Sequence, residues 1–280
     1  MFSVYTSAFN IIKNNYDYIT AFKNYDDFAD EIIISTINDN DDPTIETLER
    51  IAESNNKFKI VKCDFKRADP LFWGKLRNEG LKNCTQEFCI SLDLDELLPI
   101  WQKYNWINYA RLLSYSTCDA YLVPLINLWG GKDYIRWDKD VNYLFKWALH
   151  KNLKNEKKLT RGAVNFAKKL DGTVDISKSD TNELIYEDGS LVRAESVIKD
   201  YQGSPYKYIQ ECASKIFIYH IGYLHFEDKL LRNKNFWNEQ FNIQAGFNQK
   251  DLANKFAPTD EKDLGGKNLI KHNLKLWDIK

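Results

Sequence analysis

Three acids stand together where an apolar segment ends, in CISLDLDELLP at residues 89–99. Asp93 and Asp95 are two positions apart, and side chains with this spacing in a strand project to the same face. Two carboxylates on one face repel each other unless a cation lies beside them. Mg²⁺ or Mn²⁺ suits that position, because these hard cations take oxygen ligands and share their shell with substrate phosphates. The spacing therefore predicts a divalent-metal site at Asp93 and Asp95, with Leu94 turned into the packing behind them.

The same acids have other interpretations. They could form a solvated acidic turn before a helix, since carboxylates are favoured near helix N-termini. A calcium loop would need a glycine after alternating acids, whereas Leu97 and Leu98 occupy the continuation. An aspartyl phosphatase would carry its acid pair after the first strand. A sugar nucleotidyltransferase would open with a glycine-rich phosphate loop, and SVYTSAFNIIKNN contains no glycine. The metal site and the acidic turn both stay open on this motif alone.

Alternating strand and helix patterns precede the acids. Strands are expected at residues 2–9, 30–38, 58–65 and 87–95, and helices at 11–29, 44–54 (with Thr44 as its N-cap) and 70–84. Strands joined by single helices imply right-handed βαβ units and a mainly parallel sheet. Ligands bind at the carboxyl ends of the strands in such sheets, which is where Asp93 and Asp95 stand. The fold class is expected to be α/β, with helices flanking the sheet.

The pattern changes after Pro99. A helix is expected at 101–116, a strand at 119–131, a strand at 215–226 and a helix at 227–244. The chain between is polar, rich in lysine and hard to assign up to about residue 188. No linker or repeat separates the two parts, so we expect a single domain over residues 1–280.

The composition is that of an ordinary globular protein, with 44% hydrophobic and 28% charged residues in 280. A formal net charge of -1 gives no basic face for nucleic acid. No apolar run approaches the about 20 residues that span a bilayer, and the N-terminal segment lacks the features of a signal peptide. The five cysteines are scattered without a C-x-x-C pair, which indicates reduced thiols and a cytoplasmic protein.

Motifs on both sides of the acid pair occur in one order. The helix predicted at 70–84 matches a g-x-x-R-N-x-G pattern at Gly74, Arg77, Asn78 and Gly80. It leads into a strand that ends in D-L-D-E, which matches a D-x-D-E/D metal motif. In this combination residues 1–100 resemble the GT-A glycosyltransferases, in particular the family 2-like enzymes of the D-x-D type. A later segment, IFIYHIGYLHF, is similar to the y-H-x-G segment found late in many of them.

The resemblance implies a GT-A fold, a Rossmann-like mixed and mainly parallel sheet with an elaborated C-terminal half. Residues 1–99 would bind the nucleotide-sugar, and residues 100–280 would bind the acceptor and form a C-terminal extension. The implied reaction moves a sugar from a nucleoside-diphosphate donor (UDP- or GDP-sugar) to a hydroxyl of a glycan, lipid-linked or protein acceptor, with inversion. A catalytically inactive nucleotide- or carbohydrate-binding protein on the same fold is the alternative.

By this resemblance, Thr6, Asp39 and Asp64 would lie at the nucleotide base and ribose, and carboxylates there can accept hydrogen bonds from ribose hydroxyls. Arg77 would contact the nucleotide half, with the bidentate geometry that suits phosphate; its alternative is a surface arginine on an amphipathic helix. Three neighbours in the same loop could take the role of Asp39 at the nucleotide equally well: Asn38, Asn40 and Asp41.

The resemblance also implies that Asp95 binds Mn²⁺ or Mg²⁺ directly. Asp93 would touch the ribose, or the metal through water. His220 would complete the metal shell, and Gly222 would leave space beside its imidazole; a satisfied core histidine is the alternative. His225 would face away from His220 if the strand continues.

An inverting transferase also needs a carboxylate that takes the proton of the acceptor hydroxyl. Asp188 and Glu187 are preferred by their place in the chain, and Asp138 and Asp140 are the other candidates. Each of the four could instead be a surface acid. The lysine-rich stretch 146–169 would suit an anionic lipid-linked acceptor or peripheral membrane contact, or else a solvated face.

Overall fold

The computed structural model describes residues 1–38, 41–66, 72–137, 145–152, 192–199 and 204–224, together with short strands at 159–161, 167–168, 174–175, 184–186 and 268–271.

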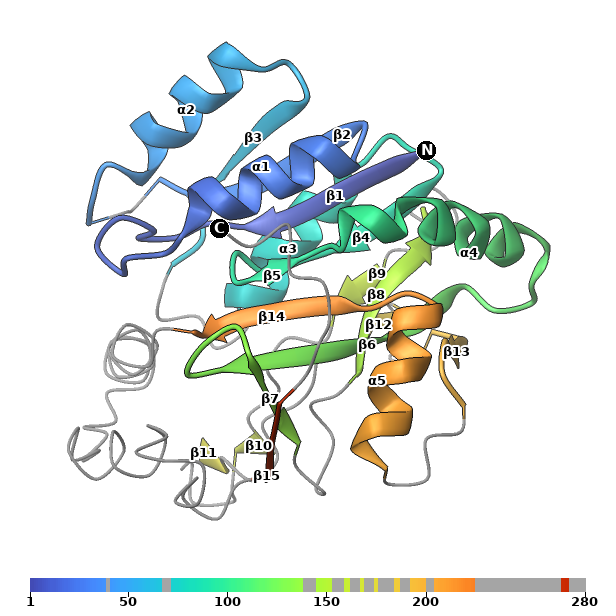
Figure 1. Ribbon diagram of the computed structural model, residues 1–280. Helices are drawn as coiled ribbons and strands as arrows, with labels where there is room; N and C mark the ends of the chain where they lie inside the picture. Colours follow the sequence, from blue (N-terminus) through green and yellow to red (C-terminus); the bar gives the residue numbers. More distant parts are fainter. Residues whose placement is uncertain are drawn as a thin grey trace.

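The N-terminal half is a parallel α/β layer (Figure 1). Its strands are β1 (Phe2–Ser7), β2 (Glu31–Ile37), β3 (Phe58–Cys63) and β4 (Phe88–Ser91), in the order β3-β2-β1-β4. The helices between them are α1 (Tyr18–Phe28), α2 (Thr44–Ser54) and α3 (Phe72–Lys82). Every residue of β1 and β2 is buried, as expected where helices cover both faces of a parallel sheet.

The predicted elements of this half are all present; α2 has the predicted bounds and the others are shorter. Residues 11–16 precede α1 rather than belonging to it, because Asp17 caps that helix by accepting a hydrogen bond from Thr20 N at 3.3 Å. Thr44 is not the N-cap of α2, so that prediction was wrong. Thr44 is the first helical residue, and its N–H donates to Asp42 Oδ1 at 3.0 Å.

The C-terminal half extends the same sheet with strands of mixed direction. Its larger strands are β6 (Ala120–Trp129), β7 (Tyr134–Trp137), β8 (Phe145–Lys151) and β14 (Ile218–Tyr223). Strand β8 runs antiparallel to both β4 and β6 and so joins the halves. Short strands complete the sheet: β5 (Glu96–Leu97), β13 (Ala194–Ser196) and β15 (Asn268–Lys271).

The remaining described elements surround this sheet. They are the 3₁₀ turn η1 (Ile100–Gln102), α4 (Lys103–Tyr115), α5 (Pro205–Ser214), and the antiparallel pairs β9 (Leu159–Arg161) with β12 (Leu184–Tyr186) and β10 (Ala167–Lys168) with β11 (Val174–Asp175). The predicted α/β class, with a parallel helix-flanked half and an elaborated second half, is confirmed. The helix predicted at 227–244 lies outside the described residues.

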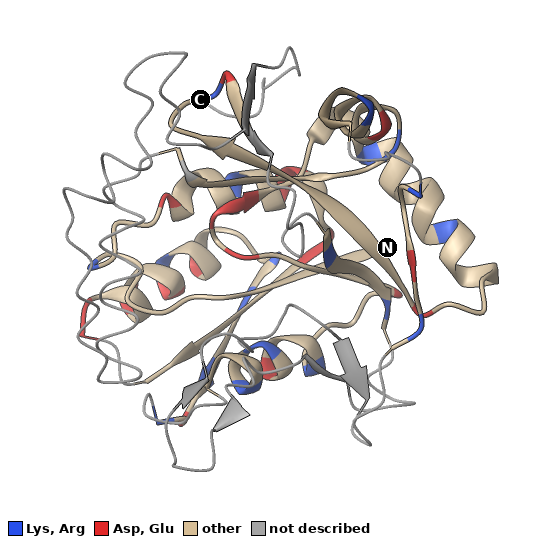
Figure 2. Ribbon diagram, turned by 90° about the horizontal axis from the view of Figure 1, so that it is seen from below, with Lys and Arg blue, Asp and Glu red and all other residues tan. Residues whose placement is uncertain are grey.

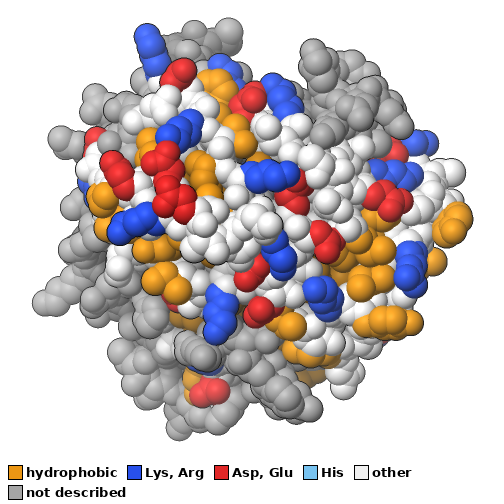
Figure 3. Space-filling model, turned by 90° about the horizontal axis from the view of Figure 1, so that it is seen from above, with side chains coloured by type: hydrophobic (Ala, Val, Ile, Leu, Met, Phe, Trp, Pro, Cys, Tyr) orange, Lys and Arg blue, Asp and Glu red, His pale blue; other side chains and the backbone are white. Residues whose placement is uncertain are grey.

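Charged residues lie mainly on helices and loops, while the strands are largely uncharged (Figure 2). On the face seen in Figure 3, basic and acidic side chains are interspersed rather than gathered by sign. No helix among the described residues is long and apolar enough to cross a bilayer.

Candidate functional site

Asp93 and Asp95 lie in a turn between β4 and β5, not in a strand, and Glu96 begins β5. The predicted strand 87–95 ends at Ser91, so strand alternation does not set the directions of Asp93 and Asp95. Instead, Glu96 N donates to Asp93 O at 2.9 Å. Tyr25 of α1 closes the turn from behind, since its hydroxyl donates to the carbonyls of Asp93 at 2.7 Å and Glu96 at 3.0 Å. Leu94 is buried, as predicted.

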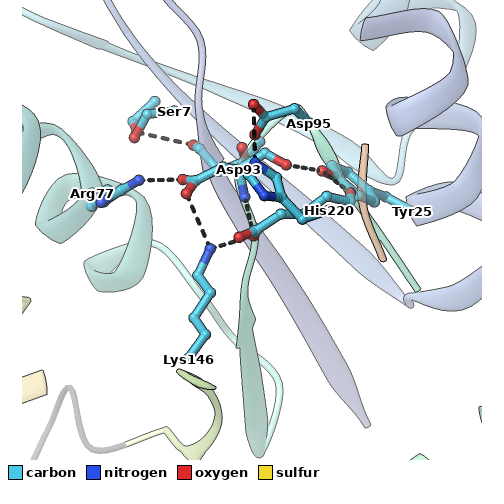
Figure 4. A network of polar contacts seen from close by, with 10 residues as sticks. Ser7, Tyr25, Arg77, Asp93, Asp95, Lys146 and His220 are labelled. Carbon is cyan, nitrogen blue, oxygen red and sulfur yellow. Dashed lines mark hydrogen bonds and ion pairs between the residues drawn. The ribbon is translucent and has the colours of Figure 1, made fainter. Parts of the chain in front are cut away.

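Two cations surround the Asp93 carboxylate (Figure 4). Arg77 of α3 donates to Oδ1, and Lys146 of β8 donates to Oδ2 at 3.2 Å. Lys146 is fully buried and also pairs with Glu96. Glu96 in turn accepts a hydrogen bond from Asp93 N at 2.8 Å. Asp93 is therefore the centre of an ion-pair network: Arg77 and Lys146 contact its carboxylate, and Glu96 accepts a hydrogen bond from its backbone N–H.

Burial governs the charges in this network. It raises the pKa of the Glu96 carboxyl above its usual value, although Lys146 acts in the opposite direction. Burial also works against the charged form of Arg77, but the adjoining Asp93 carboxylate outweighs it and raises the pKa of Arg77. Arg77 therefore stays cationic. Its Nε atom is buried and has no hydrogen-bond partner among the described residues.

Asp95 faces a different neighbour, His220 of β14. His220 Nε2 lies 3.5 Å from Asp95 Oδ2, and these side chains are 17% and 13% exposed. Two backbone contacts fix this approach: His220 pairs with Glu96 in the β14–β5 ladder, and Ile221 N donates to Asp95 O at 2.8 Å. On the far side of the ring, Nδ1 lies 2.6 Å from Asn127 Oδ1. The structure thus brings Asp95 and His220 together, and their roles as metal ligands stay predictions.

This pair fits a hard divalent cation as two of its ligands. A carboxylate oxygen and an imidazole nitrogen are accepted ligands of Mn²⁺, and their separation allows both to contact one ion. Within the part of the chain that is described, no group of three or more His, Cys, Asp or Glu side chains is arranged to hold a metal. Two protein ligands suffice where substrate phosphates and water complete the shell. Asp93 is the less suited third ligand, because both of its carboxylate oxygens already contact cations.

The residues predicted at the nucleotide base lie at the ends of β1 and β3. Thr6 is 1% exposed, and its Oγ1 has no hydrogen-bond partner among the described residues. Asp64 is exposed and accepts a hydrogen bond from Asn38 at the end of β2. The nucleotide roles of Thr6 and Asp64 stay predictions.

Several predicted residues fall outside the described part of the chain: Asp39, Asp138, Asp140, Glu187, Asp188 and His225.

Sequence reasoning missed three residues of the site. Lys146 was grouped with a lysine-rich stretch expected to be solvated or to face an anionic partner; for Lys146 both interpretations were wrong, because it is fully buried. Its place beside Trp147 and Ala148 in an apolar strand was the available signal. Asn127 had a comparable signal, as the one amide in the apolar run of β6. Tyr25 had none, since its partners are backbone carbonyls of a remote turn.

No protein-family model matches the chain, and no curated protein does. Among solved structures, the chain is similar to S. aureus TarS in complex with UDP-GlcNAc, with a TM-score of 0.40, 16% identity, and coverage of 73% of this chain and 60% of that one. Another TarS structure gives a TM-score of 0.41 at 16% identity, covering 89% and 76%. The mannosyltransferase PcManGT from Pyrobaculum calidifontis, in complex with GDP-Man and Mn²⁺, gives 0.35 at 18% identity, covering 44% and 34%. The chain thus spans 60% of the length of the TarS chain solved with UDP-GlcNAc.

Proposed function

We propose that this chain is a metal-dependent glycosyltransferase that moves a sugar from a nucleoside diphosphate to an acceptor hydroxyl. The observation that carries the proposal is the placement of Asp95 beside His220, in a turn at the carboxyl end of the parallel strand β4. That edge is where α/β sheets bind their ligands. An oxygen ligand and a nitrogen ligand there, near the partly buried Arg77, suit a cation together with a diphosphate.

The charges of the described site support different roles for Asp93 and Asp95. Asp93 and Glu96 face Arg77 and Lys146, so these two cations are already matched by carboxylates. A diphosphate entering beside them needs further positive charge. Asp95 and His220 would hold a divalent ion, which would act as a Lewis acid on the departing diphosphate. Asp93 would keep Arg77 and Lys146 in place rather than bind that ion.

The reaction also needs a base for the acceptor hydroxyl. Asp188 or Glu187 remains the proposed base, with inversion at the sugar carbon. The acceptor class remains a glycan, lipid-linked or protein hydroxyl.

The test is nucleotide binding with and without Mn²⁺. UDP, GDP and CDP are each added to the chain at millimolar concentration, and the melting temperature is recorded. Binding to the folded state stabilises it by about 2.7 kcal/mol at 100 times the Kd. We expect at least one diphosphate to raise the melting temperature in the presence of Mn²⁺ and not with EDTA. If no diphosphate does so, the proposed function is wrong.

A further inference from the structure

Asn127 is the neighbour of His220 on the adjacent strand. Strands β6 and β14 run parallel, with His220 opposite Asn127 in register. The register shifts after His220, so His220 and Asn127 form the last regularly paired residues before that shift. Asn127 is half-buried, while Ile126 and Leu128 on either side are fully buried. Placing a polar amide in this apolar strand is costly unless the amide makes a hydrogen bond.

The hydrogen-bond distances assign the ring protons of His220. Asn127 Oδ1 is an acceptor only, so at 2.6 Å the ring nitrogen Nδ1 must be the donor. On the other side, 3.5 Å between Nε2 and Asp95 Oδ2 is too long for a good hydrogen bond. In the neutral ring, a proton on Nδ1 leaves Nε2 with its lone pair toward Asp95. Two electron-rich atoms then face each other, an arrangement that a cation between them would stabilise.

We propose that Asn127 is a positioning residue: it holds the Nδ1 proton of His220 and so presents Nε2 as a metal ligand beside Asp95. The part of this inference that concerns the metal ion rests on the proposed function. The part that places the proton of His220 on Nδ1 does not. The structure records no other hydrogen bond for the Asn127 side chain among the described residues. Among the described residues, the Asn127 amide therefore serves His220 and no other element, unlike an amide that is buried only to satisfy the core.

The first test reads the ring without any metal. Long-range ¹H–¹⁵N spectra of the metal-free chain at pH 8 report which nitrogen of His220 carries the proton, with His220→Ala used to assign the signal. We expect the Nδ1-protonated form in the wild type and a shift toward the Nε2-protonated form in Asn127→Leu. Asn127→Asp keeps an acceptor at the same place and should keep the Nδ1 proton. An Nε2-protonated ring in the wild type would overturn the proposal.

The second test measures Mn²⁺ itself, by calorimetric titration in the presence of a diphosphate. Loss of an outer partner of a metal-bound histidine costs about 10- to 100-fold in metal affinity. We expect a loss in that range for Asn127→Leu, a loss of about tenfold or more for His220→Ala, and near wild-type affinity for Asn127→Asp. Asn105→Leu is the matched control, because the Asn105 side chain also makes a hydrogen bond, donating to Lys215 O at 2.8 Å, but lies on α4.

The positioning role of Asn127 and the metal-dependent function can be disproved separately. If the wild type binds Mn²⁺ and Asn127→Leu binds it equally well, Asn127 has no positioning role, and the proposed function stands. If the wild type binds no Mn²⁺ with any diphosphate, the metal-dependent function is wrong, while the ring spectra still decide what Asn127 does to His220. Melting temperatures of Asn127→Leu and Asn105→Leu show whether either change merely weakens the fold.

Discussion

Asp93 and Asp95 are separated only by Leu94, yet their side chains have different partners. Asp93 contacts two cations, one of which, Lys146, is fully buried. Asp95 contacts His220 and is held through its backbone carbonyl. The two acids therefore separate into a structural carboxylate and a candidate ligand, and substitutions at the two positions should have different consequences.

Asp95→Asn tests the ligand role. The change removes a charge from the cation site but keeps the shape of the side chain and the backbone contact to Ile221. Under the proposed function, metal assistance would contribute several kcal/mol to transfer, so we expect transfer activity to fall by about 100-fold or more. The melting temperature should stay within about 2 °C, since one charge at a partly exposed site contributes little to stability.

Asp17→Asn is the matched control. It makes the same chemical change at the cap of α1, where asparagine serves as well as aspartate. Full activity in folded Asp95→Asn would remove Asp95 from the metal site.

At the scale of elements, Glu31 links the strands of the parallel half. Its side chain is 4% exposed and accepts hydrogen bonds from Ser3 Oγ at 2.6 Å, Thr85 N at 2.8 Å and Lys59 Nζ at 2.5 Å. These residues come from β1, β3 and the segment before β4. Burial alone would raise the pKa of Glu31, but the hydrogen bonds from Lys59, Ser3 and Thr85 lower it from 4.5 to about 2.

A lowered pKa means that ionised Glu31 stabilises the fold. That contribution is complete above the unfolded value of 4.5 and is lost as the pH falls toward about 2. We expect Glu31→Gln to lower the free energy of unfolding by about 2 kcal/mol at pH 7. The difference from the wild type should shrink between pH 4.5 and the folded pKa. Urea denaturation across this range measures it.

Glu49→Gln is the control for this series. Glu49 also pairs with a lysine, Lys62, but both side chains are more than two-fifths exposed. Exposed pairs contribute about 0–1 kcal/mol. A pH-independent difference between Glu31→Gln and the wild type would contradict the assignment.

At the scale of the whole molecule, Lys146 connects the two halves electrostatically. It lies on β8, the strand that joins β4 to β6, and its ammonium reaches Asp93 and Glu96 of the N-terminal motif. Removing one partner of a buried pair leaves a charge without compensation, which costs about 3–5 kcal/mol. We expect a loss of that size for Lys146→Met, measured by denaturant unfolding.

A second variant separates charge from packing in this prediction. Lys146→Met combined with Glu96→Gln removes the cation and one buried carboxylate together, and it should recover part of the lost stability. If the double variant is as unstable as the sum of the two single variants, the coupling between Lys146 and Glu96 is absent.

The sequence by itself determined the alternating strands and helices up to β4 and the position of the acid motif at the carboxyl edge of the sheet. Those features follow from local patterns: β2 carries an apolar run of three isoleucines at residues 32–34, and α2 spans the predicted residues 44–54. The motif order also led to Asp95 and His220, which the structure brings within 3.5 Å.

Only the tertiary structure decided what each acid does. Strand β14 pairs with β5 and β6, and β8 is inserted between β4 and β6, so segments far apart in the chain meet at residues 93–96. These pairings put Lys146 on Asp93 and Asn127 behind His220. The apolar neighbours of Lys146 and Asn127 indicate burial, but no local pattern encodes which residues of other segments these two side chains meet. The burial of Lys146 is decided by which strands pair around it, since a buried ammonium is stable only where carboxylates from another segment surround it.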